Sequence, residues 1–243
     1  MYWVKEFYLK QQEWANVYGG GITEYHRKNA ELVKNTAQGK LGDILELGAG
    51  GGQNAAALAE LGYSVTAVEL IPQLAGIACK FTSNSAPGKI EVLQDDFYEI
   101  NLEKKFDIIC YWDGFGIGSD DDQIRLLNRI ADWLKEDGFA LIEIYNPGYW
   151  KKTVGKTMKF GKVNRRYDYD YQNNRMLDRW WLRNFPENSV CQSLRCYKPE
   201  DLKTLLAETG LNLKGIYNDN IWIEDNLVDN KSMQYMIKLV KNK

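Results

Sequence analysis

The chain has little of what metal centres, disulfide frameworks and membrane spans require. Its 243 residues include one histidine and four cysteines, with no Cys-x-x-Cys pair, which excludes the familiar zinc sites. No stretch approaches the ~18 consecutive apolar residues of a membrane span, and the N-terminal residues lack the apolar core of a signal peptide. The 31 basic and 33 acidic residues nearly cancel, which argues against a dedicated nucleic-acid binder. We therefore expect a reduced, cytoplasmic protein without a metal and without contact to DNA or a membrane.

What is present is an alternation of short apolar runs with amphipathic stretches. Strands that alternate with crossover helices imply a parallel sheet covered by helices on both faces. Two further apolar runs near the end of the chain add strands to it. The sequence thus predicts an α/β fold with a Rossmann-like, seven-stranded, mostly parallel sheet. Its strands are expected at 43–47, 64–70, 90–94, 106–111, 138–145, 211–217 and 233–240.

The pattern changes after residue 147. From 163 to 197 the apolar and polar residues alternate with a period of two, which predicts three antiparallel strands. Asn173-Asn174 and the segment from Pro186 to Asn188 are the expected turns. We expect one domain, 1–243, in four parts. These are an N-terminal helical lid (1–40), a cofactor-binding core (41–147), a β insertion (148–198) and a C-terminal helix with strands (199–243).

A glycine-rich turn joins the first strand to the first helix of the core. It reads Glu46-Leu47-Gly48-Ala49-Gly50-Gly51-Gly52-Gln53-Asn54. Glycines let the backbone approach a ligand, and the helix that follows offers free N–H groups. Glu69, at the end of the second strand, follows Gly48 by the ~20 residues expected of a carboxylate that binds ribose hydroxyls. We expect this strand end to face solvent.

Gln53 bears on which nucleotide the turn binds. A dinucleotide turn, Gly-x-Gly-x-x-Gly, requires glycine at this position, where the pyrophosphate approaches the helix. The glutamine therefore disfavours a nicotinamide-dependent oxidoreductase.

The order Glu46-x-Gly48-x-Gly50-x-Gly52 resembles the first motif of class I S-adenosylmethionine-dependent methyltransferases. Glu69 matches the acidic residue that binds both ribose hydroxyls in that family, and Asp95-Asp96-Phe97 matches the segment that meets the adenine. The resemblance covers residues 40–145, and a looser likeness to small-molecule methyltransferases covers the rest. It implies S-adenosylmethionine as cofactor and S-adenosylhomocysteine as product. The cofactor-binding residues it implies are Glu46, Gly48, Ala49, Gly50, Gly52, Asn54, Glu69, Leu70, Asp95, Asp96, Phe97 and Tyr111.

The ends of the fourth and fifth strands are where an acceptor is expected to bind. Methyl transfer from a sulfonium is an in-line displacement, so the protein mainly aligns the acceptor and excludes water. Asp113 is the candidate that could orient an ammonium or hydroxyl group or act as a base. His26 is a second catalytic candidate, on a helix that could close over the cofactor. The residues expected to bind substrate are Tyr18, which resembles a lid aromatic of small-molecule methyltransferases, and Trp112, Tyr145 and Asn146.

Other functions remain open. The segment 151–166 contains seven basic residues and no acidic one, so it could hold RNA or a protein in a polymer methyltransferase. It could equally be a solvated surface segment. A cofactor-binding scaffold without turnover is the non-enzymatic alternative. We expect a small-molecule acceptor, no RNA partner, and a monomer or homodimer.

Overall fold

The central element is a sheet of eight strands in the order β11-β10-β12-β5-β4-β1-β2-β3. The computed structural model describes residues 2–83, 86–218, 221–223 and 228–242. Strands β1 to β5 run parallel to one another, whereas the pairs β5–β12, β12–β10 and β10–β11 are antiparallel. The eight strands are β1 (Asp43–Leu47), β2 (Ser64–Glu69), β3 (Lys89–Gln94), β4 (Phe106–Tyr111), β5 (Leu134–Tyr145), β10 (Leu211–Asn218), β11 (Ile221–Ile223) and β12 (Gln234–Lys241).

The predicted mostly parallel sheet is confirmed, but the count of seven strands is wrong. The additional strand is β11, which pairs with β10 at the sheet edge. It has three residues, and Ile221 and Trp222 remain 71% and 45% exposed. A strand this short, with no buried face, carries no periodic signal. The strand expected at 138–145 begins earlier, at Leu134.

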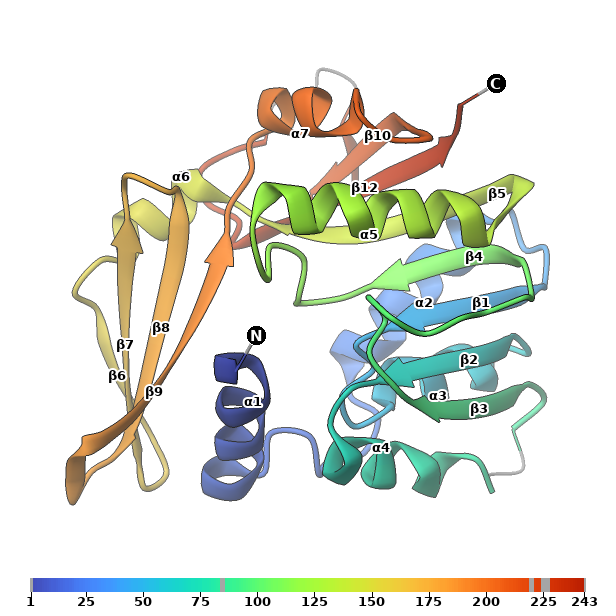
Figure 1. Cartoon of the computed structure of the whole chain (residues 1–243). Helices are drawn as coiled ribbons and strands as arrows, with labels where there is room; N and C mark the ends of the chain where they lie inside the picture. Colours follow the sequence, from blue (N-terminus) through green and yellow to red (C-terminus); the bar gives the residue numbers. More distant parts are fainter. Residues whose placement is uncertain (1, 84–85, 219–220, 224–227, 243) are drawn as a thin grey trace.

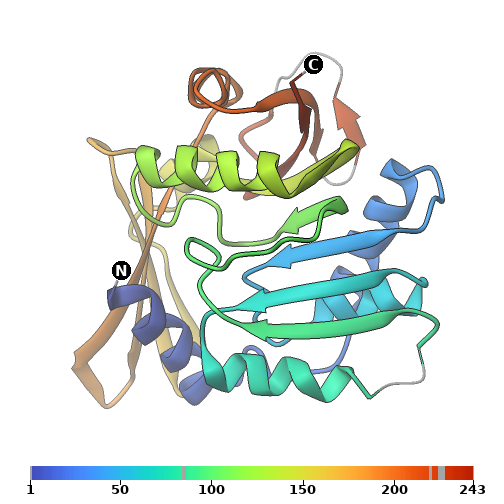
Figure 2. The same cartoon turned by 45° about the vertical axis from the view of Figure 1, so that its right-hand side comes forward.

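Helices cover both faces of the sheet, as expected (Figures 1 and 2). Successive β1 side chains point to opposite faces: Ile44 joins one apolar cluster, and Leu45 and Leu47 join the other. The first cluster includes residues of α2 (Glu24–Thr36) and α3 (Gln53–Glu60). The second includes residues of α5 (Asp120–Trp133) and α7 (Pro199–Leu206), and α4 (Pro72–Ala78) contacts β2 and β3. Parallel strands buried on both faces account for the continuous apolar runs of the sequence.

The β insertion forms a second, antiparallel sheet with the order β6-β7-β8-β9. Its strands are β6 (Thr157–Phe160), β7 (Val163–Asp170), β8 (Arg175–Leu182) and β9 (Phe185–Arg195). The three expected strands are present, and β6 is a fourth, whose four residues are all exposed and therefore show no alternation. The turn at Asn173-Asn174 is confirmed. The turn expected at Pro186–Asn188 is wrong: the chain turns at 183–184 instead. Pro186 lies in β9, an edge strand, where proline is tolerated.

Helix α1 (Tyr2–Ala15) lies between the two sheets (Figures 1 and 2). Phe7 is fully buried, and its ring meets Trp180 of β8 at 6.2 Å between centroids. The short helices α6 (Pro147–Trp150) and η2 (Lys151–Thr153) lead from β5 into the inserted sheet, and η1 (Cys79–Phe81) follows α4. No helix in the described ranges is both long and apolar enough to cross a membrane.

Candidate active site

The glycine turn after β1 brings backbone close to the carboxyl ends of the parallel strands. Gly48, Gly50 and Gly52 have φ values of +62°, +56° and +79°, a region that side chains rarely adopt. A Cβ on Gly52 would lie 2.7 Å from the Cβ of Ala78, and one on Gly48 would lie 3.4 Å from the Tyr111 ring. Gly52 also caps the N-terminus of α3. All three positions therefore favour glycine for conformation, and Gly52 requires it for space as well.

Glu69 binds the turn from the end of β2. Its Oε2 accepts a hydrogen bond from the Gly50 N–H at 2.8 Å, and its Oε1 accepts one from the Ile71 N–H at 2.8 Å. The expectation that this strand end faces solvent is wrong, because Glu69 is only 5% exposed. Burial raises the pKa of Glu69 to about 7. Each carboxylate oxygen can accept a second hydrogen bond, so acceptor capacity remains for a ligand.

Four of the predicted cofactor-binding residues do not line the cavity beside the turn. They stabilise the turn and its surroundings instead: Glu46, Ala49, Gly52 and Asn54. Glu46 is 1% exposed, and within the described residues its Oε2 has no hydrogen-bond partner. Burial, and next the neighbouring Glu69, raise its pKa to about 8. The Ala49 N–H donates to the Val68 carbonyl, Gly52 begins α3, and Asn54 accepts from Asn29.

A cavity of about 260 Å³ lies above the turn. Ten predicted site residues line it: Tyr18, Gly48, Gly50, Glu69, Leu70, Asp96, Phe97, Tyr111, Trp112 and Asp113. The sequence reasoning missed Val4, Lys5, Tyr8, Ile71, Leu74, Tyr98, Gly114 and Ile117. Val4 and Tyr8 are four residues apart on α1 and therefore share a helix face, a spacing that is visible in the sequence.

The end of β3 supplies a further part of the cavity wall. Asp96 accepts a hydrogen bond from the Tyr98 N–H at 2.9 Å, which orients its carboxylate beside the cavity. The Phe97 ring meets the Tyr111 ring edge-on at 5.4 Å. Asp95 is exposed outside the cavity and accepts from the Asp96 N–H at 2.7 Å. The two predicted aspartates therefore have different roles. Asp96 lines the cavity, whereas Asp95 stabilises the chain turn that follows β3.

Tyr18 closes the cavity over the glycine turn. The Gln53 side-chain amide donates to the carbonyl oxygens of Tyr18 and Gly20 at 2.8 and 2.9 Å. The Tyr18 hydroxyl donates to Gln11 Oε1 at 2.7 Å, and its ring lies 3.1 Å from where a Cβ on Gly50 would stand. Gln53, which disfavours a dinucleotide, therefore fixes the segment that carries the lid residue.

Asp113 lines the same cavity and comes directly after Trp112, which follows β4. Its φ of +50° is left-handed, and its N–H donates to Oε2 of the buried Glu143 at 2.9 Å. Asp113 Oδ1 accepts hydrogen bonds from the Tyr145 hydroxyl and, at 2.8 Å, from Gln234 Nε2. The side chain is accessible to solvent through the cavity, but the protein around it raises its pKa. Tyr145 acts on the cavity only through Asp113, since it does not line it.

Two predicted residues have structural roles elsewhere. The Nδ1 of His26 accepts from the Thr23 N–H at 2.9 Å and so caps α2. The buried Asn146 caps α6 by accepting from the Gly148 N–H at 2.9 Å, and its amide donates to the carbonyl of Ser232. Neither residue lines the cavity, so the geometry gives no support to a catalytic His26 or a substrate-binding Asn146.

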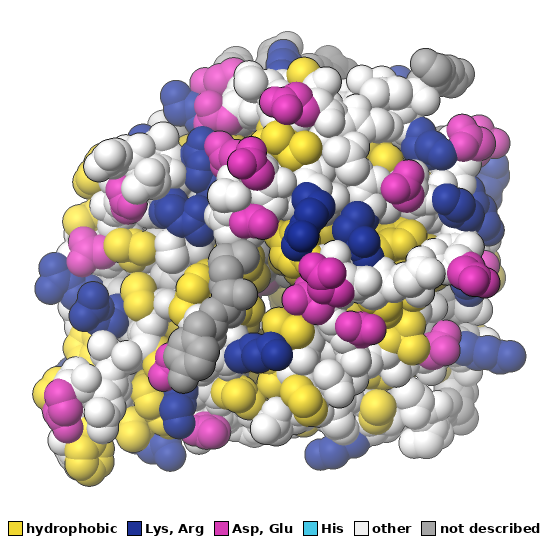
Figure 3. Space-filling view, in the orientation of Figure 1, with side chains coloured by type: hydrophobic (Ala, Val, Ile, Leu, Met, Phe, Trp, Pro, Cys, Tyr) yellow, Lys and Arg dark blue, Asp and Glu magenta, His cyan; other side chains and the backbone are white. Residues whose placement is uncertain are grey.

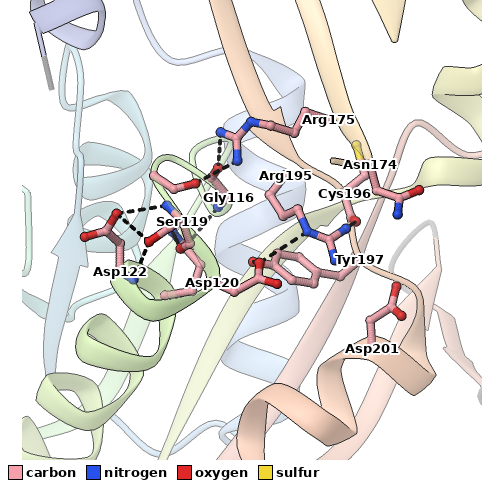
Figure 4. Close-up of polar contacts among 12 residues, drawn as sticks. Gly116, Ser119, Asp120, Asp122, Asn174, Arg175, Arg195, Cys196, Tyr197 and Asp201 are labelled. Carbon is pink, nitrogen blue, oxygen red and sulfur yellow. Dashed lines mark hydrogen bonds and ion pairs between the residues drawn. The ribbon is translucent and has the colours of Figure 1, made fainter. Parts of the chain in front are cut away.

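The inserted sheet is fixed to the loop that follows β4 (Figure 4). Arg175 of β8 donates to the carbonyl of Gly116 at 3.1 Å. At the start of α5, Asp120 accepts from Arg195 at 3.2 Å and from the Tyr197 hydroxyl at 2.7 Å. The same loop begins with Trp112 and Asp113, so these contacts hold the acceptor end of the cavity against the insertion.

Five of the seven basic residues of the segment 151–166 are exposed, and two are partly buried: Lys151 and Arg165. Arg165 is turned inward, where it forms a bidentate ion pair with the fully buried Asp178 at 2.6 to 2.9 Å. The Lys151 ammonium lies over the Tyr169 ring, 5.2 Å from its centroid. On the face drawn in Figure 3, basic and acidic side chains are interspersed among the residues described.

An α/β sheet with a glycine turn, a carboxylate at the end of β2 and a cavity beside them is typical of an enzyme fold that binds a nucleotide-type cofactor. The model of the methyltransferase domain family matches residues 22–214, and the chain belongs to that family. The match confirms the predicted class, a methyltransferase that uses S-adenosylmethionine, and with it the prediction of an enzyme.

Three similar proteins extend this result. A ubiquinone biosynthesis O-methyltransferase of Rickettsia canadensis is 26% identical over 203 residues, which are 82% of this chain and 76% of that protein. The CcbJ methyltransferase of Streptomyces caelestis has a similar structure, with a TM-score of 0.78, 18% identity and coverage of 99% and 98% of the two chains. The amino pentose methyltransferase CalS10 of Micromonospora echinaspora, solved with S-adenosylmethionine bound, has a TM-score of 0.62 and 15% identity. The match covers 92% of this chain and 93% of CalS10.

The residues present fit such a cofactor. Gly48 and Gly50 leave backbone open on the cavity where a side chain would intrude, and Glu69 and Asp96 supply carboxylates on the same wall. A carboxylate pair suits hydroxyl and amino donors of a nucleoside, and the aromatic rings of Phe97 and Tyr111 suit a planar base.

Proposed function

We propose that this enzyme transfers the methyl group of S-adenosylmethionine to a compact small-molecule acceptor by in-line displacement. The observation that carries the proposal is one cavity that is lined both by the glycine turn with Glu69 and by Trp112 with Asp113. In-line transfer needs the methyl donor and the acceptor to meet in one water-excluded space. Two similar proteins, a ubiquinone biosynthesis O-methyltransferase and an amino pentose methyltransferase, support a small acceptor.

The assignment of residues follows from the cavity walls. Glu69 and Asp96 would hold the ribose and adenine, Gly48 and Gly50 would lie against the remainder of the cofactor, and Tyr18 would cover it. When bound, the cofactor supplies an electrophilic methyl group on its sulfonium. Asp113 then orients the acceptor. We further propose that 1–243 acts as one domain, in the cytoplasm.

The arrangement of the basic segment argues against a polymer substrate. Arg165 is already neutralised by Asp178, and no basic residue of the segment lines the cavity, so a polymer held by these charges would not be held at the proposed site of transfer. RNA and protein methylation therefore remain the second candidate, without an observation in their favour.

Calorimetric titration of the protein tests the proposal. S-adenosylmethionine and S-adenosylhomocysteine should bind with dissociation constants of about 1–100 μM, while NAD and NADP should show no heat of binding. Tight nicotinamide binding with no response to S-adenosylmethionine would overturn it.

A further inference from the structure

The charged side chains of the cavity are predominantly acidic. Four ionisable side chains carry charge at its wall: Lys5 on α1, and Glu69, Asp96 and Asp113 at the strand ends. The inference below rests on the proposed function, which assigns Glu69 and Asp96 to the cofactor end. Asp113 is then the one carboxylate of the described wall that is left to face the acceptor.

The hydrogen bonds that the described residues make to the Asp113 carboxylate leave its second oxygen, Oδ2, free to contact a ligand. Both of its hydrogen bonds from side chains, from Tyr145 and Gln234, go to Oδ1. In the described part of the chain, Oδ2 receives no hydrogen bond. The backbone bond to Glu143 fixes a left-handed conformation that a residue other than glycine seldom adopts. Strain of this kind persists where the surroundings hold a side chain in one functional direction.

The surroundings of Asp113 disfavour an isolated negative charge. Its N–H donates to the buried Glu143 carboxyl, and removal from bulk water by the cavity walls raises the pKa of Asp113, as burial raises that of Glu143. Arg165 faces Asp113 from the inserted sheet, but its guanidinium already pairs with Asp178, and Asp178 adds a further negative charge nearby. A cation that enters the cavity would offset this charge.

The rings of the cavity suit a cation as well. Tyr8 and Trp112, which the proposed function does not assign to the cofactor, line it together with Asp113. Aromatic faces attract a desolvated cation by about 0.5–2 kcal/mol, whereas a neutral hydroxyl gains no such term.

We propose that the acceptor is a primary or secondary amine, which enters as its ammonium ion and is held by Asp113 beside these aromatic residues. Asp113 is also the group that accepts one proton from it: the N–H bond breaks, an O–H bond forms on the carboxylate, and the electron pair stays on nitrogen. The nitrogen is then nucleophilic. A hydroxyl acceptor would bring no charge to offset that of Asp113.

The test is the binding of matched probes to protein saturated with S-adenosylhomocysteine. Cyclohexylamine and benzylamine are compared by calorimetry with cyclohexanol and benzyl alcohol, which differ from them only in the polar group. Each amine should bind about tenfold or more tightly than its alcohol. Asp113→Asn should weaken the amines about tenfold or more and leave S-adenosylhomocysteine within about twofold. Asp137→Asn, which removes an exposed carboxylate near the start of the same strand as Glu143, should change neither.

Each outcome decides the proposal. If neither amine binds, if the alcohols bind equally well, or if Asp113→Asn binds the amines unchanged, the amine assignment is overturned. The comparison of amine with alcohol on the unaltered protein does not depend on whether the variant folds. If S-adenosylhomocysteine itself fails to bind, the proposed function fails, and that result is read before any amine is added.

Discussion

The two ends of the cavity are built in different ways. The cofactor end comes from a short stretch of sequence: the turn from Gly48 to Gly52 after β1, with Glu69 and Asp96 at the ends of the two neighbouring strands. The acceptor end is assembled from α1, the loop after β4, β5 and β12, and the inserted sheet is fixed to that loop. The cofactor end therefore depends on backbone geometry and on residues that are close in sequence. The acceptor end depends on side chains from elements that are distant in sequence. Substitutions at the two ends should separate cofactor binding from turnover.

The largest effect is expected from the turn itself. Gly52→Val would place a side chain at φ +79° and within 2.7 Å of Ala78 Cβ. Strain and overpacking together should cost about 2–4 kcal/mol of unfolding free energy and abolish cofactor binding. Urea unfolding measures it. Gly76→Ala, in helix α4 with open space around it, is the control and should be neutral or stabilising. Equal effects at both positions would contradict the turn geometry.

Glu69→Ala should weaken S-adenosylhomocysteine binding about tenfold or more, because the carboxylate is the proposed partner of the ribose. It should also lower stability by about 1–3 kcal/mol, since the N–H groups of Gly50 and Ile71 lose their acceptor in a buried place. Calorimetry and urea unfolding measure the two effects. Unchanged affinity in a folded variant would show that the ribose lies elsewhere.

At the acceptor end, Trp112→Ala should impair turnover rather than cofactor binding. We expect turnover to fall about tenfold or more while the affinity for S-adenosylhomocysteine changes less than about threefold. Steady-state kinetics with an identified acceptor, compared with calorimetry on the same variant, separates the two. If the variant loses cofactor affinity as much as turnover, Trp112 contributes to cofactor binding and the assignment of this residue to the acceptor is wrong.

The buried carboxyl behind Asp113 predicts a dependence of stability on pH. Burial raises the pKa of Glu143 from 4.5 to about 8, so the folded state holds this proton more tightly than the unfolded state. Stability must therefore fall as the pH rises from about 4.5 to 8. Glu46 and Glu69, also raised, contribute in the same direction. Glu143→Gln should reduce the fall between pH 5 and 8.5 by about 1 kcal/mol or more, measured by urea unfolding at both values. An unchanged fall would show that Glu143 is ionised at little cost.

The smallest effect is expected from the basic segment. Replacing Lys151, Lys152, Lys156 and Lys159 by glutamine should change turnover on the small acceptor less than about twofold. The protein should show no appreciable RNA affinity at physiological salt. A submicromolar RNA complex that weakens steeply with salt and is lost in this variant would favour the polymer substrate.

The sequence was sufficient where local chemistry decides the structure. The turn from Gly48 to Gly52, the carboxylate Glu69 and the lid residue Tyr18 all lie where the motifs and the glycine break place them. It was insufficient where a partner is distant in sequence. Nothing near Asp113 indicates that Glu143 and Gln234 bind it, or that α1 brings Tyr8 to the same cavity.

The two predicted residues that lie outside the cavity show a related effect. Residue type and position make His26 and Asn146 candidates, but the side chain of each satisfies backbone groups at a helix start. Strands β6 and β11 were missed because exposed edge strands lack the alternation that marks a buried face.

The most direct test of the central claim is a crystal structure of the protein with S-adenosylhomocysteine. The two-ended cavity predicts that both ribose hydroxyls lie within hydrogen-bond distance of Glu69, that the base lies beside Asp96 and Phe97, and that the sulfur faces Trp112 and Asp113. A ligand bound outside this cavity, or one whose sulfur points away from Asp113, would contradict it.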